Sequence, residues 1–383
     1  MNLLQKINLR SNTILVSLAL LSLAGPLIVE NTKVMRKKKW YDEKLAAAQL
    51  CKTSAEKLKL YFYGNAEFVD NLNDPNETGL IGHEYSPITS ERGSFVAKAT
   101  SLNPNFAGLV VEFLNELELK EGDRVAVGVT GSFPGLNLAV YSALQTLKLK
   151  PTIICSVTSS SWGANNPDFT WLDMDKVLKD SVKFSFGASA ATMGASQDLG
   201  RGLSNEGIEY VNQAIERNQV QLLKFNDMGE DVSKRMALYR LEAEGQPIKA
   251  YINVGGGVAS IGSDKNRFVI SSGLNKKMNL STFVDKKGVI YEMTKEGIPV
   301  IQMLDVQKLA SEYKLPINPI PLPSPGEGPL FQELKYNMWV VGIVTFILLA
   351  VISFIIYQDK KNIKLGKDIL RSEHDSSDNE LIL

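Results

Sequence analysis

The sequence predicts an α/β fold, in which a mainly parallel sheet carries flanking helices and a transmembrane helix lies near each end of the chain. Three observations lead to this prediction. Strand-like and helix-like segments alternate through the middle of the chain, which is typical of α/β sheets rather than repeat arrays. One stretch, residues 124–157, has the pattern strand, glycine turn, helix, strand. Two long uncharged segments lie close to the termini.

The stretch from residue 124 to 157 is the clearest unit of the predicted sheet. Residues 124–130 (RVAVGVT) are apolar and β-branched, the pattern of a strand buried on both faces. Glycines and a proline interrupt this run at 131–135, and leucines and valines recur at helical spacing from 136 to 147. A second apolar run at 152–157 completes a βαβ unit. The arrangement is Rossmann-like, and the turn after its first strand lies where such sheets bind ligands.

The other elements follow from the same patterns. Helices are expected at 40–62, 104–119, from Asp173 as the cap through Lys179, at 205–218, at 230–244, and from the capping residue Asp305 to Tyr313. Strands are expected at 182–186, 222–225, 249–254 and 299–303. Segments rich in small and turn-forming residues predict loops at 65–92 and 187–202.

Composition limits the classes of function. Lysine plus arginine equals aspartate plus glutamate, at 42 each in 383 residues, which gives no support to nucleic-acid binding. Two histidines and two cysteines are too few for an ordinary zinc site. No cofactor is evident, although a carboxylate site for Mg²⁺ or Ca²⁺ stays open. Cys51 and Cys155 could form a disulfide, but their apolar surroundings favour buried free thiols.

Both ends of the chain indicate a membrane. Residues 11–29 and 338–357 carry no charge and have the length that a spanning helix needs. Trp339 and Tyr357 stand at the ends of the second segment, as in interface anchoring. Ser22-Leu23-Ala24 also resembles a signal-peptidase site, and we favour an uncleaved anchor over cleavage there. The numbers of basic residues beside the two segments differ too little to determine the orientation in the membrane. The basic residues that follow the second helix favour cytoplasmic termini, and a cytoplasmic middle domain is the alternative.

These observations give a domain plan. It consists of a cytoplasmic N-terminus at 1–10, a transmembrane helix or signal anchor at 11–29, a stalk helix and loop at 30–79, and the α/β domain at 80–315. A stiff proline-rich spacer follows at 316–337, then the second transmembrane helix at 338–357, and a basic, then acidic, tail at 358–383 whose last part, 372–383, is expected to be disordered.

The first candidate site is the turn after the first strand. Backbone N–H groups and hydroxyls beside a helix N-terminus can bind an anion. The candidate ligand-binding residues of this turn are therefore Thr130, Gly131, Ser132 and Gly135. The turn is neither a P-loop nor a G-x-G-x-x-G motif, and a tight turn without a ligand is equally compatible. Ser132 is also a candidate catalytic nucleophile with His83 as its base, although Thr130 replaces the first glycine of a nucleophile elbow.

Two further loops follow predicted strands at the same sheet edge. The first offers hydroxyls, an amide and an indole to a carbonyl-rich or sugar-like ligand, through Ser159, Ser160, Ser161, Trp162 and Asn165. The second offers close backbone approach at Gly255, Gly256 and Gly257, with Ser260 nearby. Each could instead be a loop that satisfies only its own backbone. Asp168, Asp173 and Asp175 are caps or solvated charges as readily as metal ligands, and a fourth loop, 187–201, allows an Asp198–Arg201 pair.

Several of these segments together resemble one family. They are Ile81–Thr89 (IGHEYSPIT), Thr100–Phe106 (TSLNPNF), GDRVAVGVTGSFPGLNLAV, SSSWGANNPDFTWLDM and VGGGVASIG. In this combination the chain resembles the poly-γ-glutamate system proteins, accessory membrane components of poly-γ-glutamate synthesis, over most of residues 80–260. The resemblance implies a capsule-type polymer at the cell envelope, with the polymer, its synthase subunits and the membrane as partners. It implies no catalytic residue.

Two classes of function therefore stay open at this point. The first is a non-enzymatic accessory subunit whose α/β domain binds the polymer or the synthase at a crevice lined by glycine and serine. The second is a membrane-anchored hydrolase or transferase acting on γ-glutamyl bonds with Ser132 as nucleophile. A purely structural bridge between membrane partners is a third possibility. A mainly parallel sheet would bring the glycine loops to one rim and so make a polar pocket.

Overall fold

The computed structural model describes residues 12–64 and 70–380. The chain divides into two units: an α/β domain, Lys37–Gln332, and a helical unit made from the two ends of the chain. The expected cytoplasmic N-terminus, 1–10, and part of the loop expected at 65–92 lie outside the described residues.

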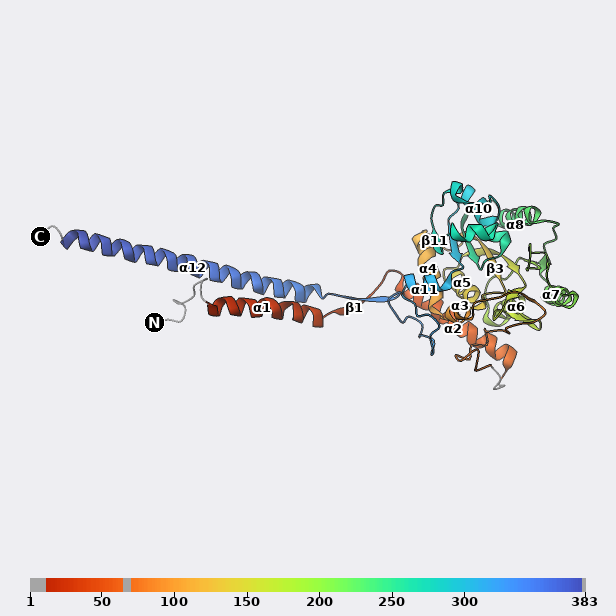
Figure 1. The fold of residues 1–383 in the computed structure, drawn as a ribbon, viewed down its shortest axis with the longest axis horizontal. Helices are drawn as coiled ribbons and strands as arrows, with labels where there is room; N and C mark the ends of the chain where they lie inside the picture. The colour runs from red at the N-terminus through yellow and green to blue at the C-terminus, as the bar shows by residue number, and fades with distance from the viewer. Residues whose placement is uncertain (1–11, 65–69, 381–383) are drawn as a thin grey trace. The chain divides into compact units, whose positions relative to one another are not determined.

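The α/β domain is built on a seven-stranded sheet (Figure 1). Its spatial order is β11 (Gly273–Asn275), β12 (Val300–Met303), β10 (Ile248–Val254), β3 (Arg124–Thr130), β4 (Lys150–Ser156), β8 (Ala190–Thr192) and β9 (Gln221–Leu222). All neighbours are parallel except β11, which runs antiparallel to β12. The chain runs from β3 outward to β9 and then returns to β10 beside β3, so the strand order reverses between β3 and β10.

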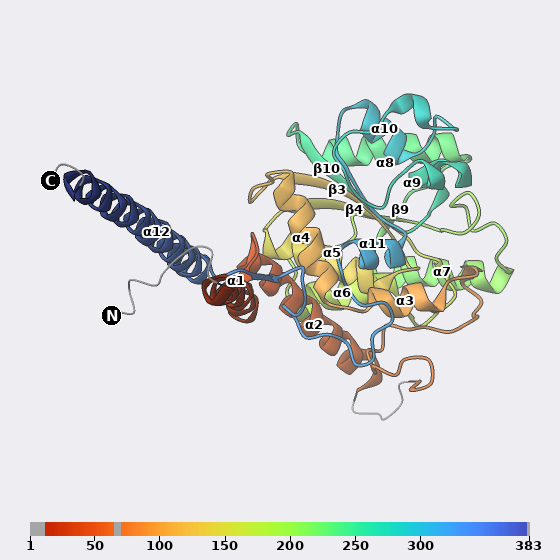
Figure 2. The ribbon, with the colours of Figure 1, turned by 60° about the vertical axis from the view of Figure 1, so that its left-hand side comes forward.

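Helices cover both faces of this sheet (Figure 2). One face carries α2 (Tyr41–Tyr63), α3 (Phe95–Ser101), α4 (Asn105–Glu116), α5 (Pro134–Thr146), α6 (Trp171–Val177), α7 (Asn205–Arg217) and α11 (Val306–Glu312), and the other carries α8 (Met228–Glu242), α9 (Val258–Ile261) and α10 (Val289–Lys295). Alternate residues of β3 enter the two cores, Val127 on the first side and Ala126 on the second. Burial on both faces explains why the strand reads as one continuous apolar run.

The βαβ unit from β3 through α5 to β4 and most other predicted elements are confirmed, but one strand was placed wrongly. The expected strand at 182–186 is absent; Leu178–Val182 forms a π-helical turn, and the strand is β8, inside the expected loop 187–202. The alternating phenylalanines misled the prediction because Phe184 and Phe186 pack around the ring of Tyr141 instead of entering the sheet. Lys183 has a left-handed backbone, φ 71°, which a strand does not tolerate.

Local structure near the sheet edge also differs from expectation. Thr170, not Asp173, is the N-cap of α6, and the Asp173 carboxylate accepts hydrogen bonds from the N–H and hydroxyl of Thr170 at 2.7 Å each. The capping function of Asp305 in α11 is confirmed. Short strand pairs that were not predicted are β2 (Thr89–Glu91) with β5 (Ser159–Ser160), and β6 (Asn165–Asn166) with β7 (Phe169–Thr170); 3₁₀ turns occur at η3 (Asp264–Phe268) and η4 (Leu280–Thr282).

The proline-rich segment belongs to the α/β domain up to Gln332 instead of forming a free spacer. The Asn76 amide donates to the Pro319 carbonyl at 2.9 Å and accepts from the Leu322 N–H at 3.1 Å. The segment also borders an apolar cavity of about 540 Å³ together with residues of α2 and α5. Side-chain amides therefore hold this stretch on the domain, an interaction that proline content does not reveal.

The helical unit contains α1 (Asn12–Asn31) and α12 (Met338–Glu380). The ranges Asn12–Asn31 and Met338–Leu365 are long and apolar enough to cross a membrane. Gly25 is the buried residue of α1; a Cβ there would lie 2.8 Å from the Val344 side chain of α12, so the absence of a side chain permits the helices to approach closely. Helix α12 continues to Glu380, through most of the tail that was expected to be disordered. β1 (Val34–Lys37) pairs with β13 (Gln332–Lys335).

Both cysteines are buried free thiols, as expected. Cys51 lies in α2 and Cys155 in β4, in the core between the sheet and its helices. Burial in apolar surroundings raises the pKa of both thiols, which keeps them protonated and unreactive.

Candidate functional site

A polar cavity of about 220 Å³ opens at the carboxyl ends of β3, β4 and β10. This is where the strand order reverses, the position at which open α/β sheets bind ligands. Six hydroxyl side chains line it, from Ser90, Thr130, Ser132, Ser156, Thr158 and Ser196. Its charged residues are Glu91, Asp198, Asp264 and Arg267. Such a lining suits a small polar ligand.

The glycine loop after β10 forms one wall. Gly255 has φ +97°, and a Cβ there would lie 2.8 Å from the Thr130 hydroxyl, so only glycine lets this loop approach β3 so closely. Gly256 and Gly257 line the cavity, and within the part of the chain that the structure describes their N–H groups meet no hydrogen-bond acceptor. The guanidinium of Arg267 lies beside them, 3.5 Å from the Gly256 carbonyl. This wall can donate hydrogen bonds to an anion.

Ser132, at the turn after β3, forms part of the opposite wall. Its hydroxyl accepts a hydrogen bond from the Ser160 N–H at 3.0 Å. The ammonium of Lys98, in α3, donates to the Ser132 carbonyl and, at 2.7 Å, to the Ser160 hydroxyl. It also lies 3.9 Å from the centre of the Phe133 ring. Lys98 thus joins the loops that follow β3 and β4.

Burial changes the proton affinity of that lysine. Lys98 is 2% exposed, and loss of hydration lowers its pKa to about 7, an effect that the Glu91 carboxylate opposes. Near neutral pH this amine can therefore exist with or without its proton. A lysine in that state can act as a general base, provided that a nucleophile and substrate reach it.

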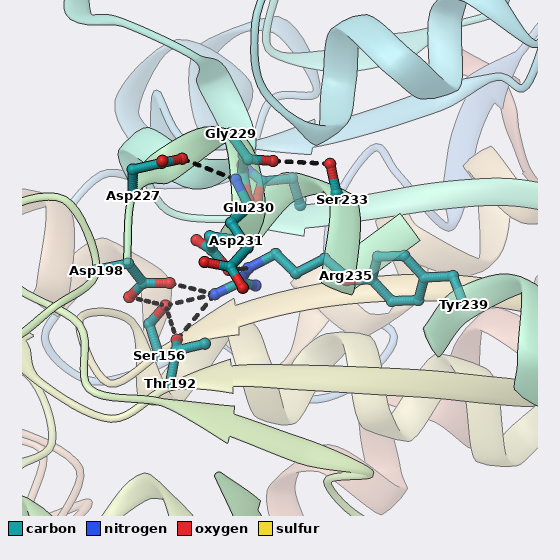
Figure 3. A network of polar contacts seen from close by, with 12 residues as sticks. Ser156, Thr192, Asp198, Asp227, Gly229, Glu230, Asp231, Ser233, Arg235 and Tyr239 are labelled. Atoms are coloured by element: carbon teal, nitrogen blue, oxygen red, sulfur yellow. Dashed lines mark hydrogen bonds and ion pairs between the residues drawn. The ribbon is translucent and has the colours of Figure 1, made fainter. Parts of the chain in front are cut away.

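A buried ionic cluster lies behind the cavity at the ends of β4 and β8 (Figure 3). Arg235 of α8 pairs with Asp231 at 2.8 Å and with Asp198, and it donates to the Thr192 hydroxyl at 2.8 Å. Asp198 also accepts from the Ser156 hydroxyl at 2.9 Å. Burial, and then the neighbouring Asp198, raise the pKa of Asp231 to about 7 against the attraction of Arg235. Two carboxylates share one guanidinium, so the fully ionised cluster carries one negative charge in excess.

The serine-rich loop after β4 does not line this cavity. Ser159, Ser160 and Ser161 are buried and are held by the pairing of β2 with β5 and by bonds to neighbouring backbone. The Trp162 indole packs edge-on against Phe95. Asn165 is fully buried, and its amide bonds both backbone groups of His83 and the Thr89 hydroxyl, at 2.8 Å each. The structure therefore gives this loop a scaffolding role.

Of the residues in the turn after β3, some face the polar cavity and others do not. Thr130 and Ser132 face the cavity, whereas Gly131 is buried against the carbonyls of Val157 and Thr158. Gly135 borders the apolar cavity instead, and a Cβ there would lie 2.5 Å from the Ser101 carbonyl oxygen. Of the residues expected to bind an anion at this turn, Thr130 and Ser132 therefore line the polar cavity, and Gly135 borders the apolar one.

The other residues considered for chemistry are occupied elsewhere. Asp173 pairs with Arg217, and Asp175 accepts from the Ala188 N–H at 3.0 Å. The Ser132 hydroxyl bonds Ser160 and, among the described residues, has no contact with His83. Asp198 pairs with Arg235, while Arg201 bonds Gln197, which corrects the expected Asp198–Arg201 pair. No group of three metal-ligating side chains occurs in the described parts of the chain.

Sequence reasoning missed Lys98, Arg235, Asp231, Glu91 and Arg267. The spacing of Asp231 and Arg235, at i and i+4 on the helix expected at 230–244, is that of an ion pair, but such pairs usually lie on solvated faces. Nothing in the local pattern distinguished Lys98 from a surface lysine. Its function depends on two loops distant in sequence, so only the tertiary fold could indicate it.

Comparison of the chain with known proteins finds no matching family model, no matching curated protein and no matching solved structure. The class that can be stated is therefore structural. The chain is a mixed α/β protein with a seven-stranded, mostly parallel sheet, a polar cavity at the strand-order reversal, and two terminal helices long and apolar enough to span a membrane.

Proposed function

We propose that the protein is a membrane-anchored accessory component of poly-γ-glutamate synthesis or export, and that its Rossmann-like domain binds the polymer in the polar cavity between β3 and β10. The polymer and the envelope setting come from the resemblance of residues 80–260. The observation that carries the binding role is the cavity itself, where Ser132, Gly256 and Gly257 come together from separate loops. Hydroxyls and backbone amides at a strand-order reversal suit a ligand rich in carboxylates and carbonyls.

The anchoring part of the proposal rests on the helical unit. In the proposed topology both terminal helices cross the membrane, so both termini lie on one side, and the basic residues that follow residue 357 favour the cytoplasmic side. The α/β domain then faces the exterior of the cell. The close fit of Gly25 against Val344 supports an N-terminal helix that is retained as an anchor.

The test uses the full chain in lipid nanodiscs and purified poly-γ-glutamate. Binding is measured by sedimentation of the polymer with the nanodiscs, for the wild type and for Gly256→Val, whose side chain would enter the cavity wall beside Arg267. We expect the polymer to bind the wild type and to bind the variant more weakly. Gly229→Val is the control, because Gly229 lies in helix α8, outside the lining of this cavity, and the atom nearest to an added Cβ is a carboxylate oxygen of Asp227 at 3.2 Å. Absence of binding to the wild type would refute the proposal.

A second candidate is a hydrolase or transferase acting on γ-glutamyl bonds. The observation that favours it is the buried Lys98 amine, 2.7 Å from the Ser160 hydroxyl and bonded to the Ser132 carbonyl. Ser132 faces the cavity and would be the nucleophile. Incubation of the polymer with the full chain or with Ser132→Ala should then give different chain lengths. Equal and unchanged lengths would leave the binding role alone.

A further inference from the structure

The two walls of the cavity have opposite electrical character. On the β10 side, Arg267 and the N–H groups of Gly256 and Gly257, which meet no acceptor among the described residues, offer donors. On the β4 side, Asp198 offers an acceptor from a cluster in which two carboxylates share one guanidinium, and Glu91 is exposed at the edge of the cavity. A ligand that fits both walls carries a negative and a positive group.

The negative wall has unused capacity. Arg235 is shared between Asp198 and Asp231, and one oxygen of Asp231 has no hydrogen-bond partner among the described residues. Asp198 is the member of this cluster that reaches the cavity. An ammonium group placed against it would supply the charge that the cluster lacks.

The positive wall is also available to a ligand. Among the residues that the structure describes, the ion-pair partner of Arg267 is Asp264, at 3.4 Å, and the side chain of Asp264 is 81% exposed. An exposed pair of this kind contributes little, so a carboxylate in the cavity can replace it. The Arg267 fork and the glycine amides can then bind the two oxygens of one carboxylate.

We propose that the cavity binds an α-amino acid group, with its α-carboxylate against Arg267 and the amides of Gly256 and Gly257, and its α-ammonium against Asp198. A volume of about 220 Å³ is smaller than that of pockets for drug-sized ligands, so it accommodates about one residue. This deepens the proposed function and rests on it for the identity of the ligand. In a γ-linked glutamyl chain, only the amino-terminal residue carries an ammonium and a carboxylate on the same carbon. The cavity therefore selects the amino end of the polymer.

The opposite end of the polymer is a poor fit. Its last residue carries two carboxylates and no ammonium, so one carboxylate would face Asp198 and Glu91. Interior residues have a carboxylate next to a neutral amide, which cannot neutralise the cluster. The charges of the two walls therefore select one end of the polymer. The hydroxyl groups that line the cavity can accept hydrogen bonds from the N–H groups of the polymer's amides and donate hydrogen bonds to their carbonyls.

The experiment measures binding of two short γ-linked glutamyl oligomers to the full chain in neutral phosphatidylcholine nanodiscs by calorimetry. One oligomer has a free amino end and the other an acetylated amino end. We expect the free form to bind at least about tenfold more tightly, since one charge-assisted hydrogen bond contributes about 1.5–3 kcal/mol. Arg267→Gln should weaken binding of the free form by about tenfold. Arg240→Gln is the matched control, because Arg240 also forms an exposed pair, with Glu296, and does not line the cavity.

The outcomes separate this inference from the proposed function. Equal affinities for the free and acetylated oligomers would overturn the inference and leave polymer binding intact. Binding of free glutamate without binding of either oligomer would support an amino-acid cavity and refute the polymer as its ligand. An amino-end preference that persists unchanged in Arg267→Gln would show that the cavity is not its source. No binding of any of these probes would overturn both proposals.

Discussion

The loop after β4 and the loop after β10 are both rich in small residues, but the first is closed by its own hydrogen bonds and the second is open to the cavity. The loop at Ser159–Asn165 is buried, and its polar groups are hydrogen-bonded to β2 and to the backbone of His83. The loop at Gly255–Gly257 lines a cavity, and two of its N–H groups have no acceptor among the described residues. The small residues of both segments predict loops at the edge of the sheet. Whether a loop binds a ligand depends on which of its hydrogen bonds are already made.

The largest effect on stability is expected from removing the charge of Arg235, in the buried cluster at the ends of β4 and β8. Arg235→Met leaves Asp198 and Asp231 without their shared partner, and we expect the free energy of unfolding to fall by about 3–5 kcal/mol. Urea unfolding of the full chain in detergent, followed by tryptophan fluorescence, measures it. The control Arg240→Met removes an exposed pair and should lower stability by less than about 1 kcal/mol. Similar losses in both variants would contradict a special role for the buried cluster.

The stability of the closed loop, Ser159–Asn165, should depend on the side-chain amide of Asn165. Asn165→Ala removes three hydrogen bonds, to both backbone groups of His83 and to Thr89, and we expect a loss of about 2–3 kcal/mol by the same unfolding measurement. The neighbouring Asn166→Ala removes one bond, to the Asp168 N–H, and should lose about 1 kcal/mol or less. Affinity for the oligomers should be unchanged in folded Asn165→Ala. A large loss of affinity would place this loop in the binding site.

Lys98 joins the loop after β4 to the turn after β3, so its titration should make the stability of the protein depend on pH. Its pKa falls from 10.5 in the unfolded chain to about 7 in the fold, so between these values the unfolded state holds more protons. Stability should therefore increase as pH rises from 7 towards 10.5, by up to about 1.4 kcal/mol per pH unit, and be independent of this group below 7. Urea unfolding at several pH values should show this slope in the wild type and lose it in Lys98→Met. The same slope in both proteins would exclude Lys98 as its origin.

The smallest effects separate the first and the last glycine of the loop at Gly255–Gly257. Gly255→Ala places a Cβ on a left-handed backbone, 2.8 Å from the Thr130 hydroxyl, and should destabilise the protein by roughly 1–3 kcal/mol. Gly257 has φ −54°, and an added Cβ would lie 3.8 Å from Thr130, so Gly257→Ala should leave thermal unfolding almost unchanged. Equal losses in the two variants would mean that backbone strain does not position this loop.

The sequence predicts the fold better than the site for a physical reason. Local apolar runs predict strands such as β3 and β10, and the glycine turns that follow these strands indicate the edge of the sheet where the cavity lies. The predicted strand at 182–186 was wrong because Phe184 and Phe186 pack on Tyr141, a contact made by residues distant in sequence. Of the three candidate loops, those after β3 and β10 reach the cavity. The bonds that close the loop after β4 come from residues 83–91, so no local pattern could predict them.

The burial of both thiols has a practical consequence for determining which compartment holds the domain. Cys51 and Cys155 are shielded from solvent and kept protonated, so a membrane-impermeant maleimide should leave the native chain unlabelled. A single cysteine introduced at Lys33 or Lys335 would then report its side of the bilayer against a blank background, without first removing any native residue.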